Sequence, residues 1–331
     1  MPLPKVWISG RVEPGPLKLL EGKAEVEMRD DTSVCPREEY MDKVRGVDYI
    51  VACMHFPPFD QEVAQATEGR LRGYASRSVG IGQIDLALAT RYGVPCTNTP
   101  GVLVDAVAAH TVGLIIAGAR LYHQGIQMAQ AGEWLHAQST LVGQSIYGRT
   151  LAIVGLGPIG ARVARTMRLG FGMRVVYWSR TRKPELEAEL GLEYMPLYAA
   201  LALADIVSVN CALAPETRHI IDARALEVMK PTTVIVNVSR GKLIDQEALL
   251  CAVNEGRIFA AAVDVTDPEP LATDHPFLHH PRIFFQPHIG GGEIETREGM
   301  TRLAVENVLD MIEGRRPRSL LNLAVYERAD R

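Results

Sequence analysis

The stretch Leu151-Ala-Ile-Val-Gly-Leu-Gly-Pro-Ile-Gly160 decides the fold class, because an apolar run leads directly into the pattern Gly-x-Gly-x-x-Gly. A helical segment rich in small residues and arginine follows, and then a second apolar run, Met173–Trp178. Three glycines at this spacing are by themselves also typical of a surface turn. Between a strand and a helix, with a second strand after it, the pattern predicts a unit that binds a dinucleotide.

Each glycine of the pattern has its own expected role. Gly155 permits a tight turn, Gly157 lets backbone N–H groups approach a pyrophosphate at the helix N-terminus, and Gly160 lets helix and strand pack closely. The first set of predicted cofactor-binding residues is therefore the turn itself: Gly155, Leu156, Gly157, Pro158, Ile159 and Gly160.

Length and composition limit the other possibilities. A chain of 331 residues predicts two domains, and 47% hydrophobic residues, 22% charged residues and a net charge of −4 are typical of a soluble globular protein. No basic patch indicates nucleic-acid binding. The five cysteines lack a C-x-x-C spacing, and no histidine pair has a convincing metal-ligand spacing, so we expect neither a disulfide framework nor a metal.

Two apolar segments bear on the compartment. The first ten residues lack the charged-then-apolar run of a signal peptide and predict a strand instead. The stretch Val102–Ala119 contains Asp105 and His110, which favours a buried helix over a membrane span. We therefore expect a cytoplasmic protein without a membrane partner.

Short apolar runs alternate with helical patterns along the chain, and this alternation predicts parallel, doubly wound sheets. The runs are Lys5–Ser9, Glu25–Met28, Tyr49–Met54, Leu71–Ala75 and Pro95–Asn98, and then 151–154, 173–178, 206–210, 233–238, 260–265 and 283–286. The predicted fold class is α/β with two doubly wound parallel-sheet domains. A six-stranded Rossmann cofactor domain, residues 102–291, is inserted into a flavodoxin-like substrate domain formed by residues 1–101 and 292–331.

Three polar residues follow the last predicted strands of the Rossmann domain: Arg240, Glu269 and His288. The carboxyl ends of parallel strands share one edge of a sheet, so these side chains are expected to converge. An arginine can hold a substrate carboxylate, and a histidine can donate a proton to a developing alkoxide. A neighbouring carboxylate stabilises and orients the protonated imidazole. The trio suits the reduction of a 2-oxo acid, although each residue could also be an ordinary surface or turn residue.

The same residues carry a family resemblance that spans about residues 3 to 323. The segments Gly155–Gly160, Asn237–Gly241, Asp264–Leu271 and Pro287–Gly291 together resemble the D-isomer-specific 2-hydroxyacid dehydrogenases. Within that family, the segments Ser179–Lys183, Glu189–Glu193 and Asp264–Leu271 resemble glyoxylate/hydroxypyruvate reductases. The resemblance implies that Arg240, Glu269 and His288 are catalytic. It also implies that backbone amides in the stretch Ser78-Val79-Gly80 bind the substrate carboxylate. The expected substrate-binding residues are Val79, Gly80, Arg240 and His288.

The resemblance implies further cofactor contacts after the later strands: Cys211, Val238, Ser239, Asp264 and Gly290. The segment Trp134–Gly148 resembles the family's dimerisation arm, so a homodimer is expected. Glycine stands at position 82, where the family usually has an aspartate, and His55 falls in a segment expected to line the substrate site. His55 could equally be a loop histidine.

The end of the second Rossmann strand predicts which nicotinamide cofactor is used. NAD enzymes carry an acidic residue there for the adenosine ribose. Here the strand runs into Ser179-Arg180-Thr181-Arg182-Lys183, and the first acid is Glu185. Hydroxyls and guanidinium groups can bind a 2′-phosphate, which a carboxylate would repel. The segment predicts a preference for NADPH, with NAD possible, through Ser179, Arg180, Thr181 and Arg182. A solvated basic turn is the alternative.

The resulting hypothesis is an oxidoreductase that transfers hydride from NADPH to a small 2-oxo acid, glyoxylate or hydroxypyruvate, and yields a D-2-hydroxy acid. One alternative is a dehydrogenase of a bulkier 2-hydroxy acid or of phosphite. Phosphite-oxidising relatives carry a lysine at the position of Val79, which makes that substrate less favoured. Another alternative is a non-catalytic scaffold that senses dinucleotides, as in the corepressors that share this fold.

Overall fold

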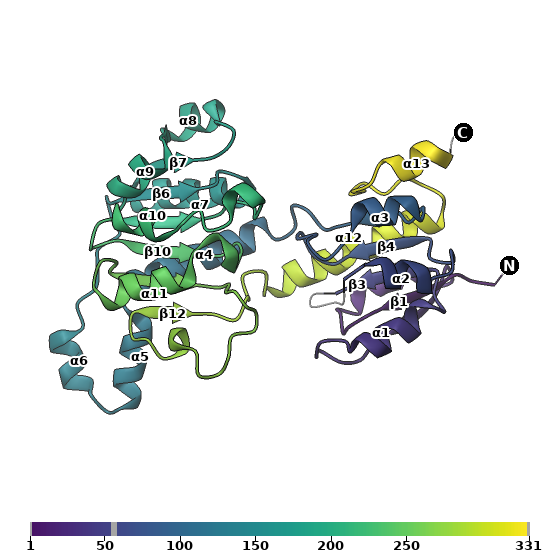
Figure 1. The fold of residues 1–331 in the computed structure, drawn as a ribbon, viewed down its shortest axis with the longest axis horizontal. Coiled ribbons are helices and arrows are strands. Elements are labelled where there is room, and N and C mark those ends of the chain that lie inside the picture. Colours follow the sequence, from purple (N-terminus) through teal and green to yellow (C-terminus); the bar gives the residue numbers. More distant parts are fainter. Residues whose placement is uncertain (1, 54–57, 330–331) are drawn as a thin grey trace. The chain divides into compact units, whose positions relative to one another are not determined.

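The computed structural model describes residues 2–53 and 58–329. The chain forms two compact units, which are coloured by sequence in Figure 1. Unit 1 comprises Met1–Leu103 and Gly292–Arg331, and unit 2 comprises Val104–Gly291. Each unit is built on its own parallel sheet, as expected for the predicted α/β class.

Unit 1 contains a five-stranded parallel sheet in the order β2-β1-β3-β4-β5. This is the 2-1-3-4-5 order of flavodoxin-like sheets. Its strands are β1 (Lys5–Ile8), β2 (Glu25–Met28), β3 (Tyr49–Ala52), β4 (Gly73–Ser76) and β5 (Cys96–Thr97). Its helices are η1 (Gly15–Leu20), α1 (Arg37–Val44), α2 (Gln61–Ala66), α3 (Leu86–Arg91), α12 (Ile294–Ile312) and α13 (Ala324–Ala329).

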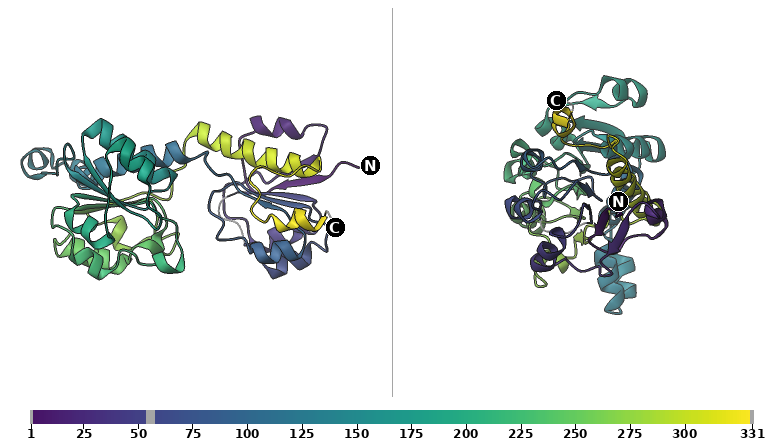
Figure 2. Two further views of the ribbon diagram at one scale, coloured as in Figure 1. Left: turned by 90° about the horizontal axis from the view of Figure 1, so that it is seen from above. Right: turned by 90° about the vertical axis from the view of Figure 1, so that its right-hand side faces the viewer.

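Both faces of this sheet are buried, because successive strand residues point to opposite sides. In β1, Trp7 packs with residues of α1, α2 and α3, whereas Val6 and Ile8 pack with residues of η1 and α12. Figure 2 (left) shows α12, in yellow, on one side of the sheet and the blue helices on the other. The final segment returns to this sheet, where the Leu321 N–H donates to the Cys96 carbonyl at 2.8 Å.

Unit 2 contains a seven-stranded parallel sheet in the order β12-β11-β10-β9-β6-β7-β8. Its strands are β6 (Thr150–Val154), β7 (Arg174–Trp178), β8 (Glu193–Tyr194), β9 (Ile206–Val209), β10 (Val234–Asn237), β11 (Ala260–Val263) and β12 (Ile283–Phe285). Counted from β6, this is the Rossmann order 3-2-1-4-5-6 with one more strand beyond it.

The helices of unit 2 lie between these strands, except for the first three, which precede the sheet. They are α4 (Val104–Ala119), α5 (Tyr122–Gln130), α6 (Trp134–Thr140), α7 (Pro158–Phe171), α8 (Pro184–Leu190), α9 (Leu197–Leu203), η2 (Pro215–Thr217), α10 (Ala223–Glu227), η3 (Gly241–Leu243), α11 (Gln246–Asn254) and η4 (Pro276–Leu278). The α4 helix packs against α7 and strands β10 and β11.

The prediction of six strands in the second sheet was wrong, because β8 is a seventh. It consists of two residues, Glu193 and Tyr194, which pair with Val176 and Tyr177 of β7. Neither residue is fully buried, so no apolar run marks the strand in the sequence. Several other strands are shorter than predicted at their carboxyl ends. There the chain leaves the sheet and forms the loops that carry the polar residues described below.

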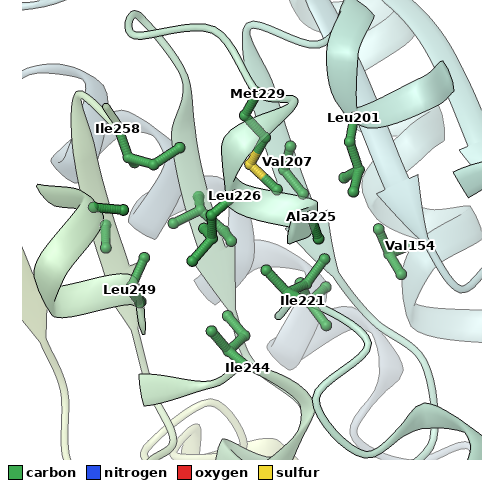
Figure 3. Packing of buried hydrophobic residues seen from close by; sticks show 14 of the residues in the cluster. Val154, Leu201, Val207, Ile221, Ala225, Leu226, Met229, Ile244, Leu249 and Ile258 are labelled. Carbon is green, nitrogen blue, oxygen red and sulfur yellow. The ribbon is translucent and has the colours of Figure 1, made fainter. Parts of the chain in front are cut away.

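The core of unit 2 on one face of its sheet is apolar throughout. Val207 and Ile235 of neighbouring strands pack against residues of α9, α10 and α11, including Leu201, Leu226 and Leu249 (Figure 3). This packing holds the strand ends at fixed positions, so that loops on separate strands can present side chains to one another.

No described helix taken singly is long and apolar enough to cross a bilayer. Helices α4 and α5 would suffice together by these two measures, but a bend of 61° separates them.

Candidate functional site

Glu269 and His288 form a hydrogen-bonded pair beyond the carboxyl ends of β11 and β12. His288 Nδ1 lies 3.0 Å from Glu269 Oε2, and Glu269 Oε1 accepts the Thr266 N–H at 3.0 Å. The two side chains are 28% and 32% exposed, so a small molecule can reach them. Because the carboxylate can only accept, Nδ1 carries the proton in this pair. Nε2 has no partner among the residues that the structure describes.

The charge state of Glu269 follows from its surroundings. Burial by itself would raise the pKa of the Glu269 carboxyl. The hydrogen bonds from His288 and from the Thr266 amide, together with the charges of His288 and Arg240, outweigh this and lower the pKa. Glu269 is therefore ionised at neutral pH and can stabilise a protonated imidazole beside it.

The backbone at His288 is held in the left-handed region, with φ of 55°. A conformation of this kind is uncommon for a residue with a side chain, and the structure around it must enforce it. Asp264, which is 1% exposed, accepts the N–H groups of Ile289 and Gly290, both at 2.8 Å. The buried carboxylate thus fixes the turn immediately after His288.

His110 of α4 lies beside the same carboxylate. Its Nε2 atom lies 3.3 Å from Asp264 Oδ1. From the sequence, His110 was expected only to lie on a buried helix. The packing of α4 against β11 brings it to this carboxylate, and no spacing in the sequence predicts that contact.

Arg240 follows β10 at the same edge of the sheet. Its backbone carbonyl accepts a hydrogen bond from Asn237 Nδ2 at 2.9 Å, and Asn237 Oδ1 accepts one from the Ser239 N–H at 3.0 Å. The Asn237 side chain thus holds the turn in place. The guanidinium is exposed and donates to the Ser239 carbonyl at 2.6 Å. Its charge contributes to the lowered pKa of Glu269. The structure thus brings Arg240, Glu269 and His288 together.

The glycine-rich turn has the geometry expected of a phosphate-binding loop. Gly155 has φ of 101°, and a Cβ there would lie 2.5 Å from the backbone of Cys211. A Cβ on Gly160 would lie 2.3 Å from the carbonyl oxygen of Gly155. Gly157 has open space around it instead. Two of the glycines are therefore required by close packing, and the third leaves room for a ligand.

The N-terminus of α7 lies at this open position. Gly157 is its N-cap and Pro158 its first residue, with no side-chain cap and no acidic residue in the first turn. Its free N–H groups and positive dipole end suit a pyrophosphate. Cys211 and Ser239 were also predicted to contact the cofactor. Burial raises the pKa of the Cys211 thiol to about 11, so the thiol is neutral. Ser239 Oγ donates to the Val209 carbonyl at 3.2 Å.

The predicted 2′-phosphate segment follows β7. Arg180 is exposed and has no hydrogen-bond or ion-pair partner in the described part of the chain. Arg182 differs from Arg180 because it forms a bidentate ion pair with Glu187 of α8. Ser179 Oγ donates to the Thr181 carbonyl at 2.5 Å. Within this segment, therefore, Arg180 has its guanidinium free and Arg182 does not.

The predicted carboxylate-binding residues Val79 and Gly80 belong to unit 1 and follow β4. The Val79 carbonyl accepts Asn98 Nδ2 at 3.0 Å, and the Gly80 N–H donates to Ser78 Oγ at 3.1 Å. Just before them, Arg77 is 4% exposed and pairs with Glu13 at 2.9 Å. Arg77 was not among the predicted residues, although an arginine directly after a buried strand could have drawn attention. His55 lies outside the described residues.

No group of three or more His, Cys, Asp or Glu residues within the described ranges could hold a metal ion. The edge of the unit 2 sheet presents one arginine, one carboxylate and one imidazole, together with a loop suited to a dinucleotide.

Comparisons with known proteins agree with this geometry. Residues 112–290 match the family described as D-isomer specific 2-hydroxyacid dehydrogenase, NAD binding domain. A glyoxylate reductase of Pyrococcus furiosus is 38% identical over 329 residues, covering 98% of this chain and 97% of that protein. The TT0316 protein of Thermus thermophilus has a solved structure with a TM-score of 0.89 at 37% identity, covering 96% of this chain and 99% of that one.

A third similar protein has been solved with ligands. An NADPH-dependent glyoxylate/hydroxypyruvate reductase of Sinorhizobium meliloti, in complex with NADP and malonate, gives a TM-score of 0.81 at 27% identity, with 97% of each chain covered.

Proposed function

Because this chain belongs to the D-isomer-specific 2-hydroxyacid dehydrogenase family, we propose that it is an NADPH-dependent reductase of glyoxylate and hydroxypyruvate. The family makes it an oxidoreductase of 2-oxo and 2-hydroxy acids. The single observation that carries the mechanism is the pair of His288 and Glu269, joined at 3.0 Å and open to solvent beside Arg240.

The residues of unit 2 fit a nicotinamide dinucleotide. The open space at Gly157 and the uncapped N-terminus of α7 would receive its pyrophosphate. When bound, the cofactor supplies the hydride that reduces the ketone carbon. By the family resemblance, Val238 and Asp264 contact the cofactor as well.

The side chains at the sheet edge supply the rest of the reaction. Arg240 binds the substrate carboxylate in a forked geometry. Protonated His288 gives the proton on Nε2 to the carbonyl oxygen at C2, so that hydride and proton together convert C=O into a hydroxyl. Glu269 holds Nδ1, orients the ring and stabilises its positive charge until the proton has left.

Turnover with a small panel of acids tests this proposal. Purified protein is mixed with NADPH, and separately with NADH, in the presence of glyoxylate, hydroxypyruvate, pyruvate or phenylpyruvate. We expect the fastest oxidation with NADPH and the two smaller acids. Activity confined to phenylpyruvate would move the substrate to a bulkier acid. No turnover with any of the four would contradict the proposal and favour the non-catalytic alternative.

The NADPH preference yields a specific prediction at Arg180. Its guanidinium has no protein partner in the described chain, so it is available for the 2′-phosphate. Hydrogen bonds to charged groups contribute about 1.5–3 kcal/mol, so Arg180→Ala should weaken NADPH binding roughly ten- to a hundredfold. The change is measured as the dissociation constant from cofactor fluorescence.

NADH provides the internal control for this variant, because it lacks the 2′-phosphate. Its affinity should be the same in the wild type and in Arg180→Ala. A variant that keeps the full NADPH preference would assign the selectivity to another residue.

We also propose a homodimer formed through the segment Trp134–Gly148. Helix α6 has no buried residue, and its Trp134 and Leu135 are 67% and 82% exposed. Val142, just after α6, is 73% exposed. Large apolar side chains gathered in this way mark protein–protein contacts more often than free surface.

A charge on this face should dissociate the dimer. Leu135→Glu places a carboxylate where we expect an apolar interface, and light scattering after size exclusion should then report a monomer. Gln65→Glu adds the same charge to an exposed polar position of α2, outside the segment Trp134–Gly148, and should leave the dimer intact. A wild-type monomer, or a Leu135→Glu dimer as stable as that of the wild type, would contradict this role for the segment.

A further inference from the structure

Glu187 of α8 forms an ion pair with Arg182, one of the two arginines of the predicted 2′-phosphate segment. Arg182 Nε donates to Glu187 Oε1 at 2.8 Å and Arg182 Nη2 donates to Glu187 Oε2 at 2.7 Å. The exposed fractions differ widely, at 62% for the Arg182 side chain and 14% for that of Glu187. The exposed arginine thus pairs with a carboxylate that is largely enclosed in the folded chain.

Glu187 is itself fixed from the strand side. The buried Tyr177 of β7 donates its hydroxyl to Glu187 Oε1 at 2.6 Å, and the same hydroxyl accepts the Lys183 N–H at 2.7 Å. The hydrogen bonds from Arg182 and Tyr177 lower the pKa of Glu187 to about 2. The carboxylate is therefore charged at neutral pH, and it is held by Tyr177 from the strand as well as by Arg182.

Arg180 and Arg182 therefore differ in what they can offer an anion. Arg180 has no partner among the described residues. Arg182, in contrast, donates hydrogen bonds from both Nε and Nη2 to the carboxylate of Glu187. Glu185, the other acid in the first turn of α8, is exposed and forms no contact with either arginine.

We propose that Glu187 is a specificity-determining residue, which restrains Arg182 and so limits the preference of this protein for a 2′-phosphorylated cofactor. The proposal rests on the assignment of residues 179–182 to the 2′-phosphate under the proposed function. Arg180 then carries most of the recognition, and Arg182 adds a smaller share.

Glu187 has two opposing physical effects on the binding of a 2′-phosphate. Their relative sizes decide whether Glu187 strengthens or weakens that binding. Holding Arg182 in one geometry reduces the entropy lost when a ligand binds, which favours binding. Against this, the carboxylate cancels the charge of Arg182 and holds its Nε and Nη2 donors, so that these groups are not available to a phosphate. Charge-assisted hydrogen bonds to a phosphate contribute more than the restricted motion of one side chain, so we infer that the second effect outweighs the entropic benefit.

A binding experiment with cofactor fragments tests the proposal. 2′,5′-ADP and 5′-AMP differ only in the 2′-phosphate, and their affinities are measured by calorimetry at low salt. Glu187→Gln should strengthen 2′,5′-ADP binding about three- to tenfold, as expected for loss of one screened charge interaction of about 0.7–1.4 kcal/mol. Binding of 5′-AMP should not change.

Two further variants show whether Glu187 acts through Arg182. Glu185→Gln removes the same charge from the same helix turn without touching the arginine, and we expect it to alter 2′,5′-ADP binding by less than about twofold, because the charge is exposed and screened. In an Arg182→Ala background, Glu187→Gln should lose most of its effect, since no guanidinium is left to release.

The outcomes separate this inference from the proposed function. A wild type that binds 2′,5′-ADP more tightly than 5′-AMP, with no gain in Glu187→Gln, overturns the role of Glu187 and leaves the NADPH preference standing. A wild type without that preference, in which Glu187→Gln creates one, overturns the NADPH preference and supports the role of Glu187. If Glu185→Gln strengthens 2′,5′-ADP binding as much as Glu187→Gln does, the effect comes from net charge near the site and not from release of Arg182. That result contradicts the proposal.

Discussion

Replacing His288 with asparagine is expected to lower kcat by about 10²- to 10⁴-fold, the usual contribution of a positioned proton donor. Asparagine is the informative substitution because it tolerates the left-handed backbone that His288 adopts, with φ of 55°. The loss can then be assigned to the missing imidazole and not to a strained turn. Steady-state kinetics with hydroxypyruvate and NADPH measure it.

NADPH affinity is the control for this variant and should remain at its wild-type value, because His288 is not assigned to the cofactor. Glu269→Gln should lose less activity than His288→Asn, since the imidazole remains but the carboxylate no longer stabilises the protonated ring. A His288→Asn enzyme with wild-type kcat would remove His288 from the mechanism.

Gly241→Ala is expected to damage both stability and activity, because this glycine lies directly against the backbone behind the site. A Cβ at position 241 would lie 2.0 Å from the carbonyl carbon and oxygen of Thr266. Thr266 in turn donates its N–H to Glu269, and Arg240 precedes the glycine. The clash must push these two loops apart, lowering the free energy of unfolding by about 1–3 kcal/mol. It should also reduce kcat/KM by more than about tenfold, since a misplaced catalytic geometry is penalised strongly.

Gly170→Ala is the matched control for that substitution. Gly170 lies in α7, and a Cβ there meets no atom within 4 Å. Alanine is the better helix former by roughly 0.8–1 kcal/mol, so this variant should be as stable as the wild type or more stable, with unchanged activity. Thermal unfolding and kinetics of both variants make the comparison. Equal behaviour of the two would contradict the role given to the close packing at Gly241.

The fold class could be predicted from sequence because its signals are local. Apolar runs alternate with helical patterns, and the glycine-rich turn identifies the first Rossmann strand, β6. The missing strand β8 shows where this reasoning ends, since Glu193 and Tyr194 carry no apolar run and are held only by pairing to β7. Strand ends were placed too late for a related reason. Residues such as Val238 and Asp264 are apolar or buried, yet they already belong to the loops.

The convergence of Arg240, Glu269 and His288 was also predictable, because adjacent parallel strands end at one edge. Their supports were not. Asp264 binds the turn after His288 through backbone N–H groups, and His110 reaches it from a helix more than 150 positions earlier. Likewise, nothing in the run from Ser179 to Lys183 indicates that Arg182 pairs with Glu187. Contacts of this kind depend on side-chain packing between elements, which leaves no periodic trace in a sequence.

The central claim is that the chain transfers hydride from NADPH to a small 2-oxo acid and yields the D-hydroxy acid. It is tested most directly by supplying NADPH deuterated at both positions of nicotinamide C4 together with hydroxypyruvate, and then determining the label and chirality of the glycerate formed. The account predicts D-glycerate that carries one deuterium on C2. L-Glycerate, or D-glycerate without deuterium at C2, would contradict it.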